Sequence, residues 1–410
     1  MSNFAFGTYR ISDINPLHVQ SIKEAVESGV KIIDTSPNYM NGGAERAIAA
    51  ALDQIDEDKR ESLEIISKFG YIQGSLLSEY KKDPSSIEDE ESIVKYSEDC
   101  YHSISRSFMQ EQLTGSLERL NLKKIDCYLV HNPEYYLFDA LNRGVYKDER
   151  LDEMYRRLED SFIGLEEEIK KGRILSYGVS SNSFSLHVGD EGFLPYEDLL
   201  TLAQNAAQIA GNKKHSFTTI QLPVNMIETE GLKCAAWAKE NGLRVLTNRP
   251  LNARYNDKMV RLADYDDSRD YFNYLNELLD ICDMQELEPL YNLFEQLDMS
   301  KHRFEWIGDY DIFLYTQIIP HIKNVLQGKE QSQNEALLNL IDMFLREYKT
   351  TVSYECSKKN KEELKEFFKE CSYSMQECAL KFLMQNNDID HIIVGMRKRA
   401  YVHQILSLEK

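Results

Sequence analysis

The sequence predicts an α/β protein, a (β/α)8 or TIM barrel with a large helical insertion after the seventh strand. Short apolar runs alternate with helical stretches in eight units, and a chain of 410 residues suits a barrel that carries insertions. An open, doubly wound sheet is the alternative. It is disfavoured because no G-x-G-x-x-G turn follows the first predicted strand.

The predicted strands are short runs rich in β-branched and aromatic residues, as expected for strands buried on both faces. They lie at 4–9, 31–36, 63–70, 125–132, 174–182, 217–225, 243–251 and 391–395. Helical spacing predicts helices between them, at 18–29, 44–55, 107–121, 158–172, 196–211, 231–242 and 374–386. Gly29 and Gly172 are expected to end two of these helices.

Two segments interrupt this alternation in what we expect to be a single barrel over residues 1–410. Residues 71–106 are polar and acidic, and we expect a long loop after the third strand. Residues 253–370 are too long for a loop and contain helical candidates at 271–284, 334–348 and 361–371, which predicts a helical insertion. Both follow strand ends where barrels build their sites, so a lid and a solvated decoration or oligomer contact both remain open.

The formal net charge of −20 argues against a nucleic-acid surface and against binding to anionic membranes. Seven cysteines without a CxxC pair favour a reducing compartment over a disulfide framework. The first residues lack a signal-peptide pattern, and no apolar run is long enough to span a membrane. We therefore expect a cytoplasmic protein.

Four polar side chains are predicted to meet at one rim of the barrel. Asp34, Lys68 and His131 lie at the ends of the second, third and fourth strands, and Tyr39 follows Asp34 in the next loop. Asp34 and Lys68 can neutralise each other, and the ammonium is expected to favour the phenolate of Tyr39. A phenol tuned in this way can give a proton to a carbonyl oxygen that a histidine orients.

Each of these residues also has an ordinary interpretation. Asp34 could cap a turn, Lys68 could be a surface lysine, His131 could satisfy a loop backbone and Tyr39 could pack. The convergence of all four on one rim favours a site.

The first strand contains Gly7-Thr8-Tyr9, and the motifs IDTSPNY followed by GGAE, ISKFG and YLVHNPE come after it in that order. In these motifs the chain resembles the aldo-keto reductase superfamily. The resemblance covers residues 4–252 and 372–406, and it implies catalysis by Tyr39 as general acid, Lys68 as its tuning cation, Asp34 as the partner of the lysine and His131 as the orienting group. It also implies hydride transfer between NADP(H) and an aldehyde, ketone or alcohol, with a sugar-like carbonyl suggested by analogy.

The resemblance implies further residues that bind the cofactor. Ser180, Ser181, Asn182 and Gln221 are expected near the nicotinamide amide, where GVSSN departs from the usual Ser-Asn pair. Asn248 stands where the family carries a stacking tyrosine. The remaining candidates are Gly7, Thr8, Tyr9, Asp34, Arg249, Pro250, Leu251, Gly395, Met396, Arg397, Lys398 and Gln404.

The cations of the last turn carry the preference for NADP over NAD. Arg397, Lys398 and Arg399 can grip a 2′-phosphate, whereas Arg249 can reach the pyrophosphate or pair with an acidic neighbour. The histidines lack zinc spacing, so no metal is expected. The alternative function is a non-catalytic NADP(H)-binding redox sensor or scaffold on the same barrel.

Overall fold

The structure, a computed structural model, describes residues 2–327 and 331–409 and contains two compact units. The barrel unit is built from the chain up to Pro250 and from Lys381 onward, and the helical unit is Leu251–Leu380. No helix within the described ranges is long and apolar enough to cross a membrane.

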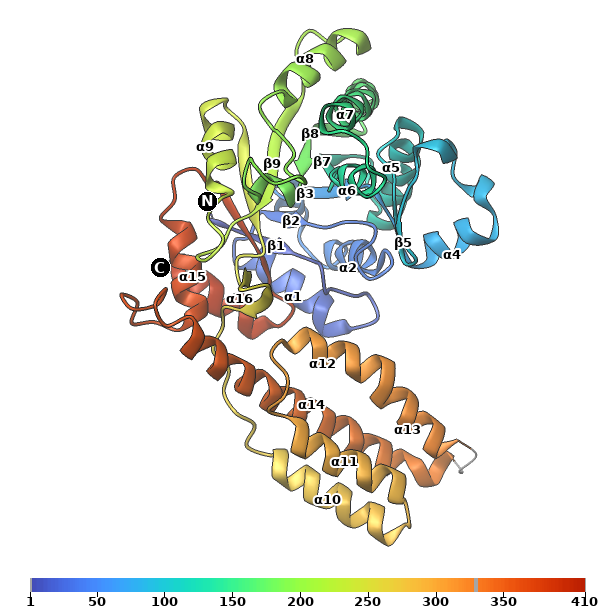
Figure 1. The fold of residues 1–410 in the computed structure, drawn as a ribbon, viewed down its shortest axis with the longest axis vertical. Coiled ribbons are helices and arrows are strands. Elements are labelled where there is room, and N and C mark those ends of the chain that lie inside the picture. Colours follow the sequence, from blue (N-terminus) through green and yellow to red (C-terminus); the bar gives the residue numbers. More distant parts are fainter. Residues whose placement is uncertain (1, 328–330, 410) are drawn as a thin grey trace. The chain divides into compact units, whose positions relative to one another are not determined.

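The barrel unit is a closed sheet of eight parallel strands, in the order β1-β13-β10-β9-β8-β7-β3-β2 (Figure 1). The strands are β1 (Phe4–Gly7), β2 (Ile32–Asp34), β3 (Glu64–Phe69), β7 (Ile125–His131), β8 (Ile174–Ser180), β9 (Phe217–Pro223), β10 (Arg244–Asn248) and β13 (His391–Gly395). The predicted (β/α)8 barrel is therefore confirmed. Its closure depends on the pairing of β1 with β13, in which Phe4 lies opposite Ile392.

Apolar side chains from six of these strands meet inside the barrel, because alternate residues of a strand point to the same face. The buried cluster is Ala5, Ile32, Ile66, Cys127, Leu129, Leu246 and Ile393. These residues explain why the apolar runs in the sequence predict the strands well.

Helices lie between consecutive strands of the barrel, and a last helix follows β13. They are α1 (Pro16–Glu27), α2 (Gly43–Leu52), α3 (Glu57–Glu61), α5 (Arg106–Leu120), α6 (Tyr135–Asn142), α7 (Lys147–Lys170), α8 (Leu199–Ala210), α9 (Leu232–Glu240), α15 (Met375–Met384) and α16 (Arg399–Leu406). The side chain of Asn15 caps α1 by accepting a bond from the amide of Leu17, and Pro16 begins the helix. Helix α7 begins earlier than periodicity predicts, and in the added part Glu153 forms ion pairs one turn away with Arg156 and Arg157.

The segment expected as a long loop after β3 has structure of its own. Strands β4 (Tyr71–Ile72), β5 (Val94–Ser97) and β6 (Cys100–His102) form an antiparallel sheet, and α4 (Gly74–Lys82) follows β4. A small apolar cluster supports this sheet and helix: Ile72, Leu77, Tyr80, Ile87 and Phe108. The polar composition of the segment concealed these few apolar contacts.

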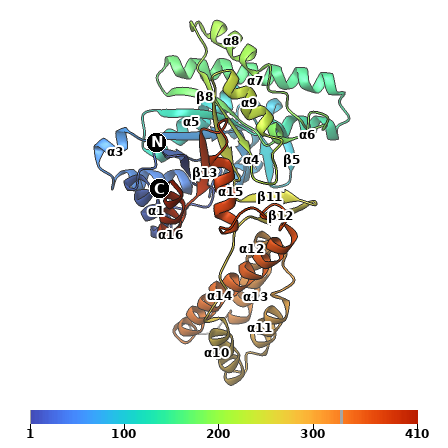
Figure 2. The ribbon, with the colours of Figure 1, turned by 90° about the vertical axis from the view of Figure 1, so that its left-hand side faces the viewer.

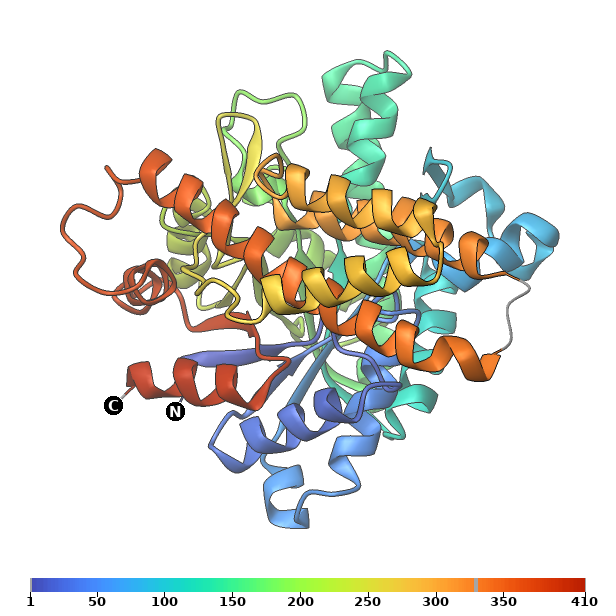
Figure 3. The ribbon, with the colours of Figure 1, turned by 90° about the horizontal axis from the view of Figure 1, so that it is seen from below.

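The helical unit starts with the hairpin β11 (Asn252–Tyr255) and β12 (Lys258–Arg261), labelled in Figure 2. It continues through α10 (Tyr271–Met284), α11 (Glu288–Ser300), α12 (Ile307–Phe313), a π-helical turn (Leu314–Ile318), α13 (Ile319–Leu326) and α14 (Gln331–Glu363). Helix α10 packs on α11 and α14 (Figure 3), around a core that includes Leu290, Phe294, Phe344 and Tyr348. The separate helix expected at 361–371 is wrong, because after Glu363 the chain continues as turns such as Phe367 N–H to Leu364 C=O.

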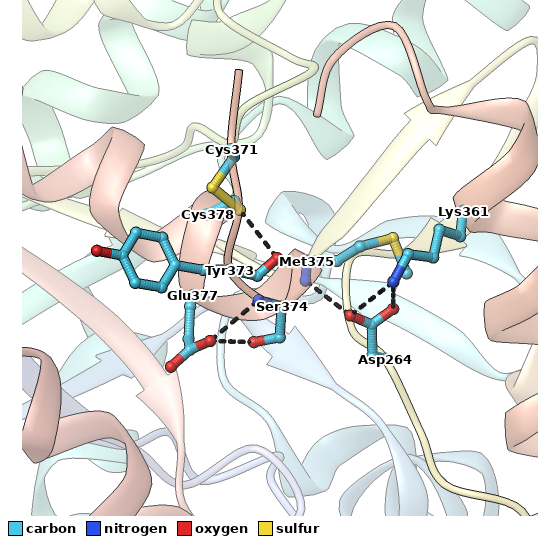
Figure 4. Close-up of a disulfide and its surroundings, with 8 residues drawn as sticks. All are labelled: Asp264, Lys361, Cys371, Tyr373, Ser374, Met375, Glu377 and Cys378. Atoms are coloured by element: carbon cyan, nitrogen blue, oxygen red, sulfur yellow. Dashed lines mark hydrogen bonds and ion pairs between the residues drawn. A yellow bond between two sulfur atoms is a disulfide. The ribbon is translucent and has the colours of Figure 1, made fainter. Parts of the chain in front are cut away.

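One disulfide joins Cys371 to Cys378 in the helical unit (Figure 4), where the spacing of the cysteines predicts free thiols. The turn before α15 brings the two Cα atoms to 6.1 Å, although the residues are seven positions apart. Close by, Asp264 accepts bonds from the ammonium of Lys361 and from the amide of Met375. The other five cysteines are free and buried.

Candidate active site

Three of the four side chains predicted to meet at the barrel rim lie on neighbouring strands. Asp34 ends β2, Lys68 is in β3 and His131 ends β7, and these strands pair in the order β2-β3-β7. Because parallel strands end at the same rim, their polar ends come together there. Tyr39 reaches the same place from the loop after β2.

Asp34 and Lys68 form a buried ion pair. The Nζ atom of Lys68 lies 2.7 Å from Oδ1 and 2.7 Å from Oδ2 of Asp34, and it also donates to the carbonyl of Thr35 at 2.8 Å. Both side chains are almost fully shielded from solvent. Burial lowers the pKa of Lys68, and the carboxylate of Asp34 opposes that shift and favours the ammonium.

The phenol of Tyr39 is the next group in this network. Its oxygen lies 3.4 Å from Nζ of Lys68. The sequence predicts that the ammonium favours the phenolate, but burial first and the charge of Asp34 second raise the pKa of Tyr39 well above its usual value. The phenol therefore stays protonated at neutral pH, which is the form that a general acid requires.

His131 lies beside the phenol, with ring centroids 6.1 Å apart. Its Nδ1 atom is 3.3 Å from the hydroxyl of Ser36. Burial, the charge of Lys68 and the neighbouring His102 hold the pKa of His131 well below its usual range. The imidazole is therefore neutral, and Nε2 is the ring nitrogen left for another partner.

The structure adds residues that the sequence did not point to. Tyr71 of β4 packs edge-on against His131 at 4.8 Å, and its oxygen accepts a bond from Asn132 at 2.5 Å. His102 of β6 contacts the carbonyl of His131 through Nε2 at 2.7 Å, and burial lowers its pKa to about 4. The short sheet β4-β6-β5 positions both rings. Tyr71 and His102 could therefore have been assigned to the site from sequence only if this sheet had been predicted.

Gly70 makes this arrangement of two histidines possible. Its φ of +148° lies in a region that side chains disfavour. A Cβ atom there would stand 2.6 Å from Nε2 of His102 and 2.7 Å from the carbonyl oxygen of His131. Only glycine fits between them.

The residues predicted to face the nicotinamide are linked to the ion pair. Ser180 donates to Oε1 of Gln221 at 2.8 Å, and Nε2 of Gln221 donates to Oδ1 of Asp34 at 2.7 Å. Ser181 and the amide of Asn182 instead bind the carboxylate of Glu134, each at 2.8 Å. A continuous polar path therefore runs along the rim from β8 through β9 to β2.

Several buried polar atoms at this rim have no hydrogen-bond partner in the described part of the chain. They are Oγ1 of Thr35, Oγ of Ser183 and Oδ1 of Asn248, which follow or end β2, β8 and β10. Buried polar groups are nearly always satisfied, so atoms left over at one rim fit a site that takes a polar ligand. The residues present thus fit a bound group with hydrogen-bonding capacity.

The candidates of the first strand have different environments. The hydroxyl of Thr8 donates to the carbonyl of Asp34 at 2.9 Å, and a Cβ on Gly7 would stand 2.8 Å from the side chain of Ile393. Tyr9 is exposed over two thirds of its surface and packs edge-on against Tyr39 at 5.2 Å. Thr8 therefore fixes the backbone at Asp34, and Tyr9 lies open beside the phenol.

The cofactor-binding candidates after β10 are not arranged simply to contact a phosphate. Arg249 has a left-handed backbone, with φ of +52°, and its guanidinium lies 3.7 Å from the carboxylate of Glu228. Pro250 and Leu251 are buried. The sequence left two roles open for Arg249, and the structure contains the acidic neighbour that one of them requires.

Some of the cationic side chains around the start of α16 already contact other side chains of the protein. Arg399 forms an ion pair with Glu24 at 2.7 Å, and the ammonium of Lys398 lies 5.6 Å from the ring centre of Tyr401. Arg397 is half-buried. Of the remaining candidates, Met396 is buried, whereas Gly395 and Gln404 are exposed.

Within residues 2–327 and 331–409, no group of three or more histidine, cysteine, aspartate or glutamate side chains is placed to hold a metal ion. The chemistry at the rim is that of a protonated phenol, a buried ion pair and a neutral imidazole.

Comparison with known protein families gives a match along nearly the whole chain. The profile described as "Aldo/keto reductase family" matches residues 4–410. The NADH-specific methylglyoxal reductase of Escherichia coli strain K12 is 28% identical over 116 residues, which are 28% of this chain. The aligned region spans only 30% of that relative's length.

Two solved structures resemble this chain at low identity. One is an aldo/keto reductase from Klebsiella pneumoniae in complex with NADP and acetate, with a TM-score of 0.45 and 13% identity over 100% of this chain and 87% of that chain. The other is an aldo-keto reductase from the same organism in complex with NADPH, with a TM-score of 0.38 and 18% identity over 61% of this chain and 64% of that chain.

Proposed function

The chain belongs to the aldo/keto reductase family, and on that premise we propose that it is an NADP-dependent oxidoreductase acting on a small aldehyde, ketone or alcohol. The observation that carries this proposal is the phenol of Tyr39 at 3.4 Å from the ammonium of Lys68, which Asp34 holds with two contacts of 2.7 Å. A half-buried phenol beside a fixed cation is equipped to move one proton.

The residues divide the work as follows. In the reducing direction Tyr39 gives its proton to the carbonyl oxygen, and the nearby ammonium of Lys68 stabilises the phenolate that forms. Asp34 holds that ammonium in place. His131, neutral at physiological pH, orients the carbonyl through Nε2.

A nicotinamide cofactor supplies the hydride when it is bound. The residues that would hold its amide are Ser180, Ser181, Asn182 and Gln221, and the unpaired Oδ1 of Asn248 lies at the same rim. Arg397 and Lys398 would meet the 2′-phosphate, because they are the cations of the last turn that form no ion pair with an acidic side chain in the described chain. These two cations are the reason why we propose NADP over NAD.

The experiment compares nucleotides and then substrates. Fluorescence titration with NADPH and with NADH should give tighter binding of NADPH, and Arg397→Ala should weaken NADPH binding while it leaves NADH binding unchanged. Turnover is then followed at the absorbance of NADPH with small aldehydes and ketones, and methylglyoxal is included because the E. coli relative is a methylglyoxal reductase.

The outcomes are distinct. NADPH-dependent turnover that Tyr39→Phe abolishes supports the proposal. Binding of NADPH without turnover of any carbonyl or alcohol would favour the non-catalytic redox sensor, and binding of neither nucleotide would refute both functions. Equal affinity for NADPH and NADH would keep the oxidoreductase and remove the role of Arg397 and Lys398.

A further inference from the structure

Glu134 is a buried carboxylate at the rim that the proposed mechanism does not use. It is 1% exposed, lies three residues after His131, and immediately precedes α6. Within the described chain, no lysine, arginine or histidine forms an ion pair with it. Burying a carboxylate without a cation is unfavourable unless hydrogen bonds compensate for the hydration that the charge loses.

Both oxygens of this carboxylate bind the turn that follows β8. Oε2 accepts from the hydroxyl of Ser181, and Oε1 accepts from the backbone amide of Asn182, each at 2.8 Å. The hydroxyl of Ser181 in turn accepts from the amide of Ser183 at 3.1 Å. One carboxylate therefore fixes three consecutive residues of the turn.

The backbone reinforces the same connection. The amide of Asn132 donates to the carbonyl of Ser180 at 2.7 Å, and the amide of Ser181 donates to the carbonyl of Gln221 at 3.0 Å. Glu134 thus joins the loop after His131 to the turn that follows Ser180, whose hydroxyl donates to Gln221. The substrate-orienting side of the rim and the nicotinamide side are held together here.

We propose that Glu134 is a positioning residue whose carboxylate holds the Ser181–Asn182 turn in the conformation that receives the nicotinamide end of the cofactor. This inference rests on the proposed function. It gives a reason for a buried carboxylate at a place where a neutral side chain would be easier to bury.

The same geometry makes the turn sensitive to pH. Burial raises the pKa of Glu134 to about 7, and the bonds from Ser181, Asn182 and Ser183 limit that rise. The titratable groups that face it are the phenols of Tyr71 and Tyr135; burial is the main cause that raises the pKa of both, and the charge of Glu134 adds to each rise. When Glu134 takes up a proton, one oxygen becomes a donor, and the carboxyl group loses the negative charge that strengthens its bonds to the turn.

Two readouts test the proposal with the full chain. The first is the NADPH affinity by fluorescence titration at about pH 6, 7 and 8. Wild-type affinity should fall as the pH is lowered through about 7. Glu134→Gln, which carries a neutral amide, should bind roughly threefold to tenfold more weakly at pH 8 and should lose this dependence. NADH serves as a parallel ligand, because it lacks the 2′-phosphate that itself titrates near ~6.

The second readout needs no nucleotide. Hydrogen exchange of the peptide covering residues 180–185, corrected for the intrinsic rate, should accelerate below about pH 7 in the wild type and stay constant in Glu134→Gln. Glu134→Asp, which keeps the charge on a shorter side chain, should restore part of the pH dependence. Thermal unfolding confirms that each variant is folded.

The matched control is Glu166→Gln. Glu166 is also fully buried and also accepts two short bonds, from Asn212 at 2.6 Å and from the amide of Ser216 at 2.7 Å, but Ser216 precedes β9 at the opposite end of the barrel. This variant should change stability without changing NADPH affinity.

The results separate the two claims. A wild-type protein that binds neither nucleotide overturns the proposed function and this inference with it. Wild-type binding that Glu134→Gln leaves unchanged in strength and pH dependence overturns the inference alone. Altered exchange with unaltered affinity gives Glu134 a purely structural role and also overturns it.

Discussion

The ammonium of Lys68 lies 2.7 Å from both carboxylate oxygens of Asp34, and the two side chains are 0% and 5% exposed. Removing one partner of a pair so fully shielded from water lowers stability strongly, because the other charge then stays buried without a counter-charge. The pair therefore supports both the fold and the proposed chemistry.

We expect Asp34→Asn to lower the free energy of unfolding by about 3–5 kcal/mol and to abolish turnover, because the ammonium of Lys68 loses its counter-charge. Urea denaturation measures the first effect. The double variant Asp34→Asn/Lys68→Met should regain much of the lost stability without regaining turnover. A single variant as stable as the wild type would contradict the buried pair.

Tyr39→Phe should lower turnover about 10²- to 10⁴-fold while NADPH affinity and stability stay close to wild type. The reason is that the phenol oxygen makes a single contact in the described chain, at 3.4 Å from Lys68. Steady-state kinetics and fluorescence titration are the measurements, with Tyr9→Phe as the control because Tyr9 is exposed next to Tyr39. Unchanged turnover in Tyr39→Phe would remove it from the reaction.

The turnover number at saturating cofactor and substrate should be flat between about pH 6 and 9. Burial raises the pKa of Tyr39 well above its usual value and lowers that of His131 well below its usual value, so neither group titrates in this range. A pH–rate profile under saturating conditions tests this. A single step near ~6.5 that persists in Glu134→Gln would mean that His131 takes up a proton during the cycle.

Stability should fall in weak acid because of His102. Its folded pKa of about 4 lies below the unfolded value of 6.5, so the unfolded chain takes up a proton first as the pH falls. This stability is present above pH ~6.5 and is lost toward pH ~4, and about 2 kcal/mol should disappear between pH ~7 and ~5. Urea midpoints at the two pH values measure it.

The control for this prediction is His102→Gln, whose amide can still donate to the carbonyl of His131. This variant should show a smaller loss of stability between the two pH values. An equal loss in both proteins would assign the acid sensitivity to another group.

Phe344→Ala should destabilise the helical unit by about 3–5 kcal/mol, because Phe344 is fully buried among Tyr271, Phe294 and Tyr348. That core consists of residues from the helical unit only. Calorimetry should therefore show one lowered transition while NADPH affinity remains. Met343→Ala is the exposed neighbour for comparison, and a comparable effect there would contradict the assignment of the core.

The barrel could be predicted from sequence because each strand is recognisable from a few consecutive residues. A buried strand such as Ile125–His131 is an apolar run from Cys127 to Val130, and the polar residue that ends it can be read directly. The same applies to Asp34 and Lys68, whose strands are adjacent in any barrel of this order.

Tyr71, His102 and Glu134 could not be found in this way. Tyr71 and His102 reach His131 through a short antiparallel sheet whose apolar residues are too few to give a period, and Glu134 matters through donors 47 and 48 residues away. The direction of the pKa shift of Tyr39 was also missed, because the loss of solvent around the phenol is set by the folded environment.

The hydrogen bond from Gln221 to Asp34 connects residues that are 187 positions apart, and β1 pairs with β13 across nearly the whole chain. Contacts of such range form late in folding, since the chain between them must first lose its freedom. During synthesis, Asp34 and Lys68 therefore emerge long before Gln221, and the ring of strands cannot close until β13 has left the ribosome. The helical unit is synthesised just before β13, and its core consists of its own residues. It can therefore fold before the last strand of the barrel has been synthesised.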